Sequence, residues 1–373
     1  MHCYLHIPFC RQRCNYCDFF LVTRQDLQER FFHALDEETI LRTAPYRDRK
    51  VKTVHVGGGT PSLVPSSYLG GWLETLDKHL SLDDTAEITL EANPEDITPE
   101  KSRELVSLGI NRLSLGVQSF RPEKLHALGR RHSADQASRV VAAALDLFGN
   151  VSVDLICGVE GESLDMWEQD LHAVLASGTP HVSVYMLSVE KKTKLESLVR
   201  RGMVSLPGEH EQAAMYLKAC ELLEEQGFLH YEVSNFSKPG FFSRYNLGCW
   251  HRESYLGFGP SAHSFTVSSQ KEIRSANVSS MLRYIASPGD AVLSSEIILE
   301  KERNDERIFL GLRLSSGLLL DELSGYHQGS RGFEETLDRL RAQGLVDIRD
   351  GVLVLSRKGF LFADKVAEEL MPS

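Results

Sequence analysis

The sequence predicts an α/β protein in which parallel strands curl into a partial (β/α)6 barrel, followed by a small winged-helix-like α+β domain. Two observations lead to this prediction. Short β-branched runs alternate with longer amphipathic stretches over the first two-thirds of the chain. After about residue 265 this alternation gives way to helices and one hairpin. A chain of 373 residues is long enough for a barrel of roughly 250 residues and a smaller domain.

The barrel elements follow from this alternation. Six strands are expected over residues 4–7, 53–56, 87–90, 112–116, 151–156 and 181–187. Amphipathic helices are expected over residues 27–41, 67–80, 99–108, 134–147, 164–176 and 208–226. Connections of this length require parallel strands joined by right-handed crossovers. An open doubly wound sheet is the alternative to a barrel.

Reactive residues follow the C-terminal ends of these strands. They are Cys10, the segment 57–60, Glu91, Gln118 and Glu190. Asp154 lies inside the fifth strand near its end, where a charge is costly unless it has a partner. Parallel α/β sheets bind their ligands at that edge. We therefore expect one ligand-binding rim.

The last third predicts a separate domain. Helices are expected over 305–314, 333–343 and 358–370, with a hairpin of strands 344–347 and 352–355 around an Asp350-Gly351 turn. This is a winged-helix-like pattern. The predicted domains are residues 1–265 and 266–373.

The composition limits the classes of partner. The chain is 42% hydrophobic and 25% charged, with a net charge of −11. Such an acidic balance argues against nonspecific nucleic-acid binding, and helix 333–343 mixes acids with bases. No apolar run approaches the ~20 residues of a membrane span, although peripheral membrane contact is compatible with the sequence. The first residues lack the pattern of a signal peptide, so a cytoplasmic protein is expected.

Three cysteines directly after the first strand predict a metal centre. Cys10, Cys14 and Cys17 lie within eight residues. Four thiolates would close an iron–sulfur cubane, whereas three leave one iron open to an exchangeable ligand. A structural zinc site normally has four protein ligands, and Cys3 or His6, both on the strand, would have to supply the fourth. Zinc and unligated thiols remain the alternatives.

The cysteine spacing, with Tyr16 before the last cysteine, resembles the signature of radical S-adenosylmethionine proteins. Further stretches resemble their anaerobic coproporphyrinogen III oxidase group and, within it, the HemW-type heme chaperones. These stretches are 5–10, 57–61, 91–94, 115–120, 153–156, 231–236 and 255–259. The resemblance covers nearly the whole chain. It implies the partial radical S-adenosylmethionine barrel, a [4Fe-4S] cluster and S-adenosylmethionine.

The resemblance also implies individual roles in a cofactor pocket. The matching positions are Tyr4, Tyr16, Gly58, Gly59, Thr60, Glu91, Gln118, Arg130 and Asp154. Taken without the resemblance, the glycines could form a tight turn, the tyrosines could belong to the core, and Arg130 could be a surface charge. In the family, an electron enters the cluster and the bound sulfonium can be cleaved to a 5′-deoxyadenosyl radical.

Two local features separate the branches of the family. The oxidases carry another cysteine two residues beyond the third ligand, where this chain has Phe19. The chaperones carry Arg-His-Asn-x-x-Tyr-Trp, with a histidine implicated in heme binding, whereas residues 244–250 have Tyr245 and Cys249 at the two variant positions. Tyrosinate and thiolate can each ligate heme iron, so both are candidate heme ligands. A core tryptophan with an incidental thiol is the alternative.

The interpretation is therefore a heme chaperone, with heme, a heme-acceptor protein and an electron donor as its partners. One alternative is a coproporphyrinogen III oxidase-type enzyme acting on a tetrapyrrole. The other is a non-catalytic cluster-containing protein for binding or sensing. The family usually has a proline-containing turn where this chain has residues 158–161, which leaves the shape of that loop open.

Overall fold

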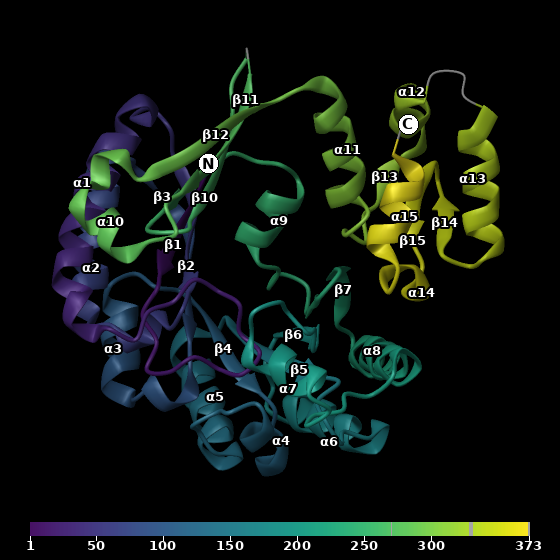
Figure 1. Ribbon diagram of the computed structural model, residues 1–373, viewed down its shortest axis with the longest axis horizontal. Helices are drawn as coiled ribbons and strands as arrows, with labels where there is room; N and C mark the ends of the chain where they lie inside the picture. Colours follow the sequence, from purple (N-terminus) through teal and green to yellow (C-terminus); the bar gives the residue numbers. More distant parts are fainter. Residues whose placement is uncertain (270, 328–330, 372–373) are drawn as a thin grey trace.

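The computed structural model describes residues 1–269, 271–327 and 331–371, and its main feature is one curved sheet of twelve strands (Figure 1). Six consecutive parallel strands form its centre: β1 (His2–Ile7), β2 (Val51–Gly58), β3 (Leu82–Ala92), β4 (Arg112–Gln118), β5 (Val151–Cys157) and β6 (His181–Met186). They lie side by side in chain order without the reversal of a doubly wound sheet. The prediction of a partial barrel is confirmed, and the doubly wound alternative is wrong.

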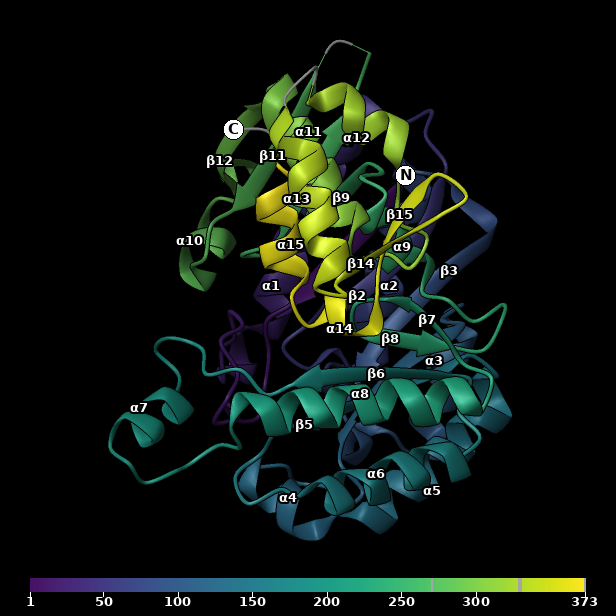
Figure 2. The ribbon, with the colours of Figure 1, turned by 90° about the vertical axis from the view of Figure 1, so that its right-hand side faces the viewer.

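The crossover helices cover the convex face of the sheet (Figure 1). They are α1 (Gln28–Thr43), α2 (Ser66–His79), α3 (Pro99–Ser107), α5 (Ala134–Phe148), α6 (Leu164–Ala176) and α8 (Glu209–Glu225). On α2, for example, Leu69, Trp72, Leu73 and Leu76 are buried, which is the spacing of one helix face. Among the described residues, five short helices escaped prediction. They are α4 (Pro122–Ala127), α7 (Lys194–Arg200), α9 (Arg244–Trp250), α10 (Met281–Ala286) and α12 (Leu320–Tyr326), and α7 projects from the body in Figure 2.

The sheet extends beyond the six predicted strands on both sides. On one side β9 (Tyr255–Phe258) pairs in parallel with β1, and antiparallel strands β10 (His263–Val267), β11 (Glu272–Asn277) and β12 (Val292–Ile298) follow it. On the other side β8 (Asn235–Ser237) and β7 (Leu229–Glu232) follow β6. The predicted domain boundary at residue 265 therefore cuts through this sheet. We place the boundary at Ile298.

The C-terminal domain contains a sheet of three strands in the order β13-β15-β14. Its elements are α11 (Glu300–Gly311), β13 (Leu318–Leu319), α12 (Leu320–Tyr326), α13 (Arg331–Ala342), β14 (Val346–Arg349), β15 (Val352–Leu355), α14 (Arg357–Phe360) and α15 (Ala363–Leu370). The predicted hairpin is present, and both Asp350 and Gly351 have positive φ, as a tight hairpin turn requires. The helix predicted over 358–370 is interrupted between α14 and α15.

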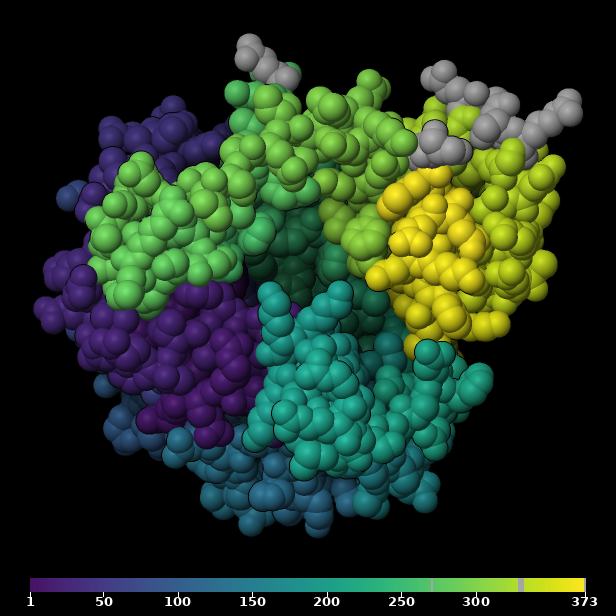
Figure 3. All heavy atoms as spheres, in the orientation of Figure 1, coloured from purple at the N-terminus to yellow at the C-terminus, as the bar shows by residue number. Residues whose placement is uncertain are grey.

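The C-terminal domain docks beside β7 and α8. Its chain pairs with the end of the large sheet, because Val233 N–H donates to the Arg313 carbonyl at 2.9 Å and Ser315 N–H to the Tyr231 carbonyl at 3.1 Å. The space-filling view shows a hollow at the centre of this face, bordered by the purple N-terminal part of the chain, a teal segment near residue 200, the green part that follows it and the yellow C-terminal domain (Figure 3). Among the described residues, no helix combines the length and apolarity needed to span a membrane.

Candidate functional site

The cysteine loop leaves β1 and is held against the end of β2. Cys10 N–H donates to the Val22 carbonyl at 3.0 Å, and Thr60 N–H donates to the Phe9 carbonyl at 2.8 Å. The Cys10 thiol lies 3.3 Å from the Thr60 hydroxyl. These bonds give the loop a defined path before any metal binds.

The three thiols lie together at the mouth of a cavity, with Cys10 buried and Cys14 and Cys17 partly exposed. Burial raises the pKa of the Cys10 thiol to about 11, so its thiolate requires a nearby positive charge such as iron. In the described part of the chain, no three His, Cys, Asp or Glu side chains converge on a single ion.

The strand residues considered as a fourth ligand are engaged elsewhere. Cys3 is fully buried in the core. The two ring nitrogens of His6 lie 3.2 Å from the Tyr4 hydroxyl and 2.9 Å from the Phe20 carbonyl. Neither side chain lines the cavity beside the three thiols.

The cluster pocket, which we define as the cavity of about 450 Å³ beside these thiols, gathers most of the predicted residues. Its lining includes Cys10, Cys14, Tyr16, Cys17, Gly58, Gly59, Thr60, Glu91, Gln118, Arg130 and Asp154. Glu91 and Gln118 are the penultimate and last residues of their strands, which are longer than predicted. Of the predicted cofactor residues, Tyr4 alone lies outside this lining.

The glycine segment forms one wall of the cluster pocket. Gly58 has φ +107°, and a side chain there would meet the His6 ring at 2.7 Å. At Gly59, an added Cβ would lie 2.9 Å from the carbonyl oxygens of Ile7 and Phe9. Glycine is thus required for the chain to pass this closely.

Two polar atoms of the cluster pocket are buried without a protein partner. One is Gln118 Oε1, on a residue with φ 68°. The other is Arg130 Nε, although a terminal nitrogen of the same guanidinium donates to Asn93 Oδ1 at 2.5 Å and to the Gly116 carbonyl at 2.6 Å. Arg130 is therefore no surface charge. Asn93, which the sequence analysis did not single out, is the residue that orients it.

Asp154 faces the same cavity from β5 and is enclosed by protein. Its oxygens accept hydrogen bonds from the Ser114 hydroxyl at 3.2 and 3.3 Å. Burial raises the pKa of this carboxyl to about 6, and the nearby negative charge of Glu91 acts in the same direction. Near neutral pH it is an anion held at a free-energy cost, which a hydrogen-bond donor on a ligand would offset.

A second cavity of about 470 Å³ lies next to the cluster pocket. We call it the aromatic cavity; it is lined chiefly by Tyr185, Glu232, Tyr245, Cys249, Trp250, Arg252, Tyr255 and Phe265. Tyr185 lines both cavities. Both candidate heme ligands face this space, and burial raises the pKa of Cys249 to about 11 and that of Tyr245 well above its ordinary value.

Tyr4 belongs with this aromatic group. Its ring stacks 6.1 Å from that of Tyr245, which in turn stacks 4.8 Å from the ring of His55. A third hollow, lined by Tyr4 and Tyr245, shares Gly58, Glu91 and the exposed Phe19 with the cluster pocket. The predicted contact of Tyr4 with the cofactor stays a prediction.

Glu232 is a buried carboxyl of the aromatic cavity that the sequence analysis did not single out. Trp250 Nε1–H donates to it at 2.7 Å, and burial raises its pKa to about 7. The signal was present, because a charged residue lies inside the motif 231–236.

The donor set fits both groups that the sequence implies. Three thiols in one loop can hold three irons of a cubane and leave the fourth open. The unpaired Gln118 and Arg130 atoms and the Asp154 carboxylate offer acceptors and a cation to a polar nucleotide, and the glycine wall lets the ligand approach the backbone closely.

The family comparisons agree with this geometry. The model of the radical SAM superfamily matches residues 4–174, and that of the HemN C-terminal domain matches residues 298–362. The second match begins at Ile298, where the large sheet ends.

Individual relatives match over nearly the whole chain. The heme chaperone HemW of Bacillus subtilis is 32% identical over 369 residues, which cover 97% of this chain and 97% of the relative. The heme chaperone HemW of Mycobacterium tuberculosis H37Rv is 36% identical, with 99% and 94% covered. Among solved structures, coproporphyrinogen III oxidase (HemN) of Escherichia coli superposes with a TM-score of 0.84 at 20% identity, covering 99% of this chain and 89% of that one. That structural match shows the fold.

Proposed function

The chain belongs to the HemW family of radical S-adenosylmethionine proteins, and from this premise we propose that it is a heme chaperone, which binds heme and delivers it to acceptor proteins. One observation carries the proposal. The aromatic cavity opens beside the cluster pocket, and its walls supply flat apolar rings together with Tyr245 and Cys249. A planar macrocycle with an iron centre matches both features.

We propose that the cluster pocket holds the cofactors. Cys10, Cys14 and Cys17 would ligate the [4Fe-4S] cluster. Gly58, Gly59 and Thr60 would lie along S-adenosylmethionine, Arg130 would meet its carboxylate, and Glu91, Gln118 and Asp154 would meet its hydroxyl and amino groups. Tyr16 would pack against it. When bound, the cluster and S-adenosylmethionine supply one-electron reductive chemistry, which an electron donor would initiate.

The chain's own residues do the positioning. The Cys10–Thr60 contact fixes the cysteine loop against the glycine wall. Asn93 and the Gly116 carbonyl aim the Arg130 guanidinium into the cavity. Tyr185, at the border of the two cavities, places a phenol between the nucleotide and heme sites.

The second candidate function is a coproporphyrinogen III oxidase-type enzyme, which the same fold would support. Phe19 argues against it. The ring occupies the position of the oxidases' additional cysteine and is 58% exposed at the entrance shared by two of the cavities. A non-catalytic cluster protein for sensing would not require an aromatic cavity of this size.

We further propose a cytoplasmic location, because seven free cysteines and an iron–sulfur cluster suit a reducing compartment.

Two parallel experiments test the proposed function. Anaerobically reconstituted protein is titrated with heme and followed by optical spectroscopy, and a second sample is incubated with coproporphyrinogen III, S-adenosylmethionine and reductant. We expect a stoichiometric heme complex that passes heme to an apo-acceptor, and no porphyrinogen product. Product formation would overturn the chaperone assignment in favour of the oxidase. Failure to retain heme, with recovery in Tyr245→His, would indicate a relative that has lost the heme site.

A further inference from the structure

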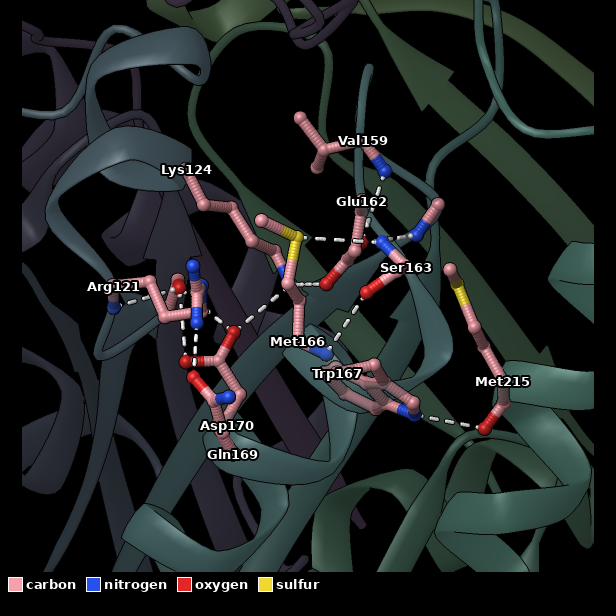
Figure 4. Close-up of polar contacts among 12 residues, drawn as sticks. Arg121, Lys124, Val159, Glu162, Ser163, Met166, Trp167, Gln169, Asp170 and Met215 are labelled. Carbon is pink, nitrogen blue, oxygen red and sulfur yellow. Dashed lines mark hydrogen bonds and ion pairs between the residues drawn. The ribbon is translucent and has the colours of Figure 1, made fainter.

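A buried charge cluster joins α4, the loop that follows β5 and helix α6, and none of its three charged side chains lines the cluster pocket (Figure 4). Lys124, on α4, places its ammonium 3.0 Å from Asp170 Oδ2 and in direct contact with Glu162. The three side chains are 5%, 0% and 3% exposed. The Trp167 ring covers the ammonium at 4.8 Å. A cation buried so completely is retained only where its partners are fixed.

Asp170 holds the turn that follows β4. Its Oδ1 accepts Phe120 N–H at 2.6 Å, and its Oδ2 accepts the Ser119 hydroxyl at 2.7 Å. The residue before this turn is Gln118, whose φ of 68° is rare for a side-chain-bearing residue. The carboxylate thus supports a conformation that Gln118 would not adopt by itself.

Glu162 holds the turn that follows the neighbouring strand β5. Its Oε2 accepts Gly158 N–H at 2.8 Å and Val159 N–H at 3.1 Å. These bonds define the loop 158–161, which lacks the usual proline. Lys124 bridges Glu162 to Asp170, so one ammonium joins the turns after two adjacent strands.

The segment that Lys124 anchors carries pocket groups at both ends. Gln118 precedes α4, and Arg130 follows it, with Arg130 N–H donating to the Leu125 carbonyl at 2.9 Å. Gln118 Oε1 and Arg130 Nε are the buried atoms of the cluster pocket without a protein partner. Two independent groups on one anchored segment therefore face the same ligand space.

We propose that Lys124 is a positioning residue of the cofactor pocket. Its ammonium, clamped by Asp170 and Glu162, holds residues 118–130 so that Gln118 and Arg130 meet the nucleotide cofactor together. The inference rests on the proposed function in that this cofactor is S-adenosylmethionine. The three charges themselves touch neither cluster nor cofactor.

The test compares iron-replete, anaerobically reconstituted full-length proteins. Lys124→Met removes the cation. Ser119→Ala keeps the charges of the same network but removes the hydroxyl that donates to Asp170 and accepts the Arg121 N–H. Lys218→Met is the matched control, because Lys218 pairs with Glu168 on the outer side of α6. The readouts are iron content, the dissociation constant of S-adenosylmethionine by equilibrium dialysis, and the change that S-adenosylmethionine causes in the electron paramagnetic resonance spectrum of the reduced cluster.

We expect Lys124→Met to keep its iron and to bind S-adenosylmethionine about tenfold more weakly, with the spectral change shifted to correspondingly higher concentrations. Ser119→Ala should weaken binding about threefold, and Lys218→Met should match the wild type. Unchanged affinity in iron-replete Lys124→Met would overturn the inference, as would loss of iron, because the network would then support the cysteine loop.

If Lys124→Met does not fold, Ser119→Ala decides, and unchanged affinity there overturns the inference. A wild-type protein that holds its cluster but binds no S-adenosylmethionine would overturn the proposed cofactor site itself. The wild-type sample alone distinguishes that failure of the proposed function from a failure of the inference about Lys124.

Discussion

The cluster pocket and the aromatic cavity share a border at Tyr185 but differ in how their polar groups are satisfied. In the cluster pocket, Gln118 Oε1 and Arg130 Nε are buried without partners. In the aromatic cavity, the charged groups pair within the protein: Trp250 donates to Glu232, and Arg252 contacts Glu306 at 2.9 Å.

This difference indicates two kinds of ligand. Unpaired buried polar atoms cost free energy until a ligand with matching groups binds, so the cluster pocket is arranged for directional recognition of a polar molecule. Internally paired charges and exposed rings suit a flat apolar ligand, whose binding depends on buried area. Single substitutions should therefore cause large losses of iron or of cofactor affinity in the cluster pocket, and smaller losses of heme affinity in the aromatic cavity.

The largest effect is expected in the cysteine loop. Cys14→Ala leaves two protein thiolates for the cluster, and we expect nearly complete loss of iron, measured as iron and sulfide per chain after anaerobic reconstitution. Cys220→Ala is the control, because that thiol is buried among core residues on α8. A Cys14→Ala protein with full iron would contradict the assignment of the three ligands.

Asp154→Asn should separate binding of S-adenosylmethionine from binding of the cluster. The amide keeps the shape of the side chain but removes the charge that a cofactor would pair with, so S-adenosylmethionine affinity should fall about tenfold while iron content is unchanged. Loss of iron together with the cofactor would show that Asp154 supports the cluster instead.

The same variant has a pH signature. Because burial raises the pKa of the Asp154 carboxyl from 3.8 to about 6, the folded state is destabilised where this group is ionised, above pH 6. Asp154→Asn should therefore raise the unfolding free energy on the order of 2 kcal/mol at pH 8, with the gain fading towards pH 4. Cofactor affinity of the wild type should fall as the pH drops through 6. Thermal unfolding and dialysis at pH 5 and 8 measure both.

In the aromatic cavity, Cys249→Ala should weaken heme binding more than Tyr245→Phe does. The Tyr245 ring is held by stacking against His55 and Tyr4, which Phe preserves, and burial raises the pKa of its hydroxyl well above its ordinary value. We expect about a tenfold loss for Cys249→Ala, with a shifted Soret band, and a smaller loss for Tyr245→Phe. The reverse order would assign the iron ligand to Tyr245.

The two regions also differed in how far the sequence revealed them. Residues of the cluster pocket follow strands with strong β-branched runs, so their shared edge follows from the parallel topology. Cys10, Gly58, Glu91 and Asp154 therefore lie around one cavity as expected. Their binding roles remain predictions.

The aromatic cavity depends on elements that lack a local signal. Strand β11 has the sequence Glu-Ile-Arg-Ser-Ala-Asn and forms because β10 and β12 pair with it on either side. Pairing between distant segments overrides the weak propensity of such a strand, and the boundary predicted at residue 265 consequently falls inside the sheet. Arg130 was hard to assign for a similar reason, since its partner Asn93 is distant in sequence.

The smallest effect is expected for Trp250→Phe, which keeps an aromatic ring in the cavity but removes the N–H that Glu232 accepts at 2.7 Å. Heme affinity should fall less than about threefold. The pKa of the Glu232 carboxyl, already raised to about 7 by burial, should rise further, so a loss of about 1 kcal/mol in unfolding free energy should appear at pH 8.5 and shrink at pH 6. In the control, Trp72→Phe, the lost partner is the uncharged Thr39 hydroxyl, so its cost in unfolding free energy should not depend on pH. Thermal unfolding measures these losses. If the loss in unfolding free energy of Trp250→Phe does not depend on pH, the Trp250 N–H does not stabilise an ionised Glu232.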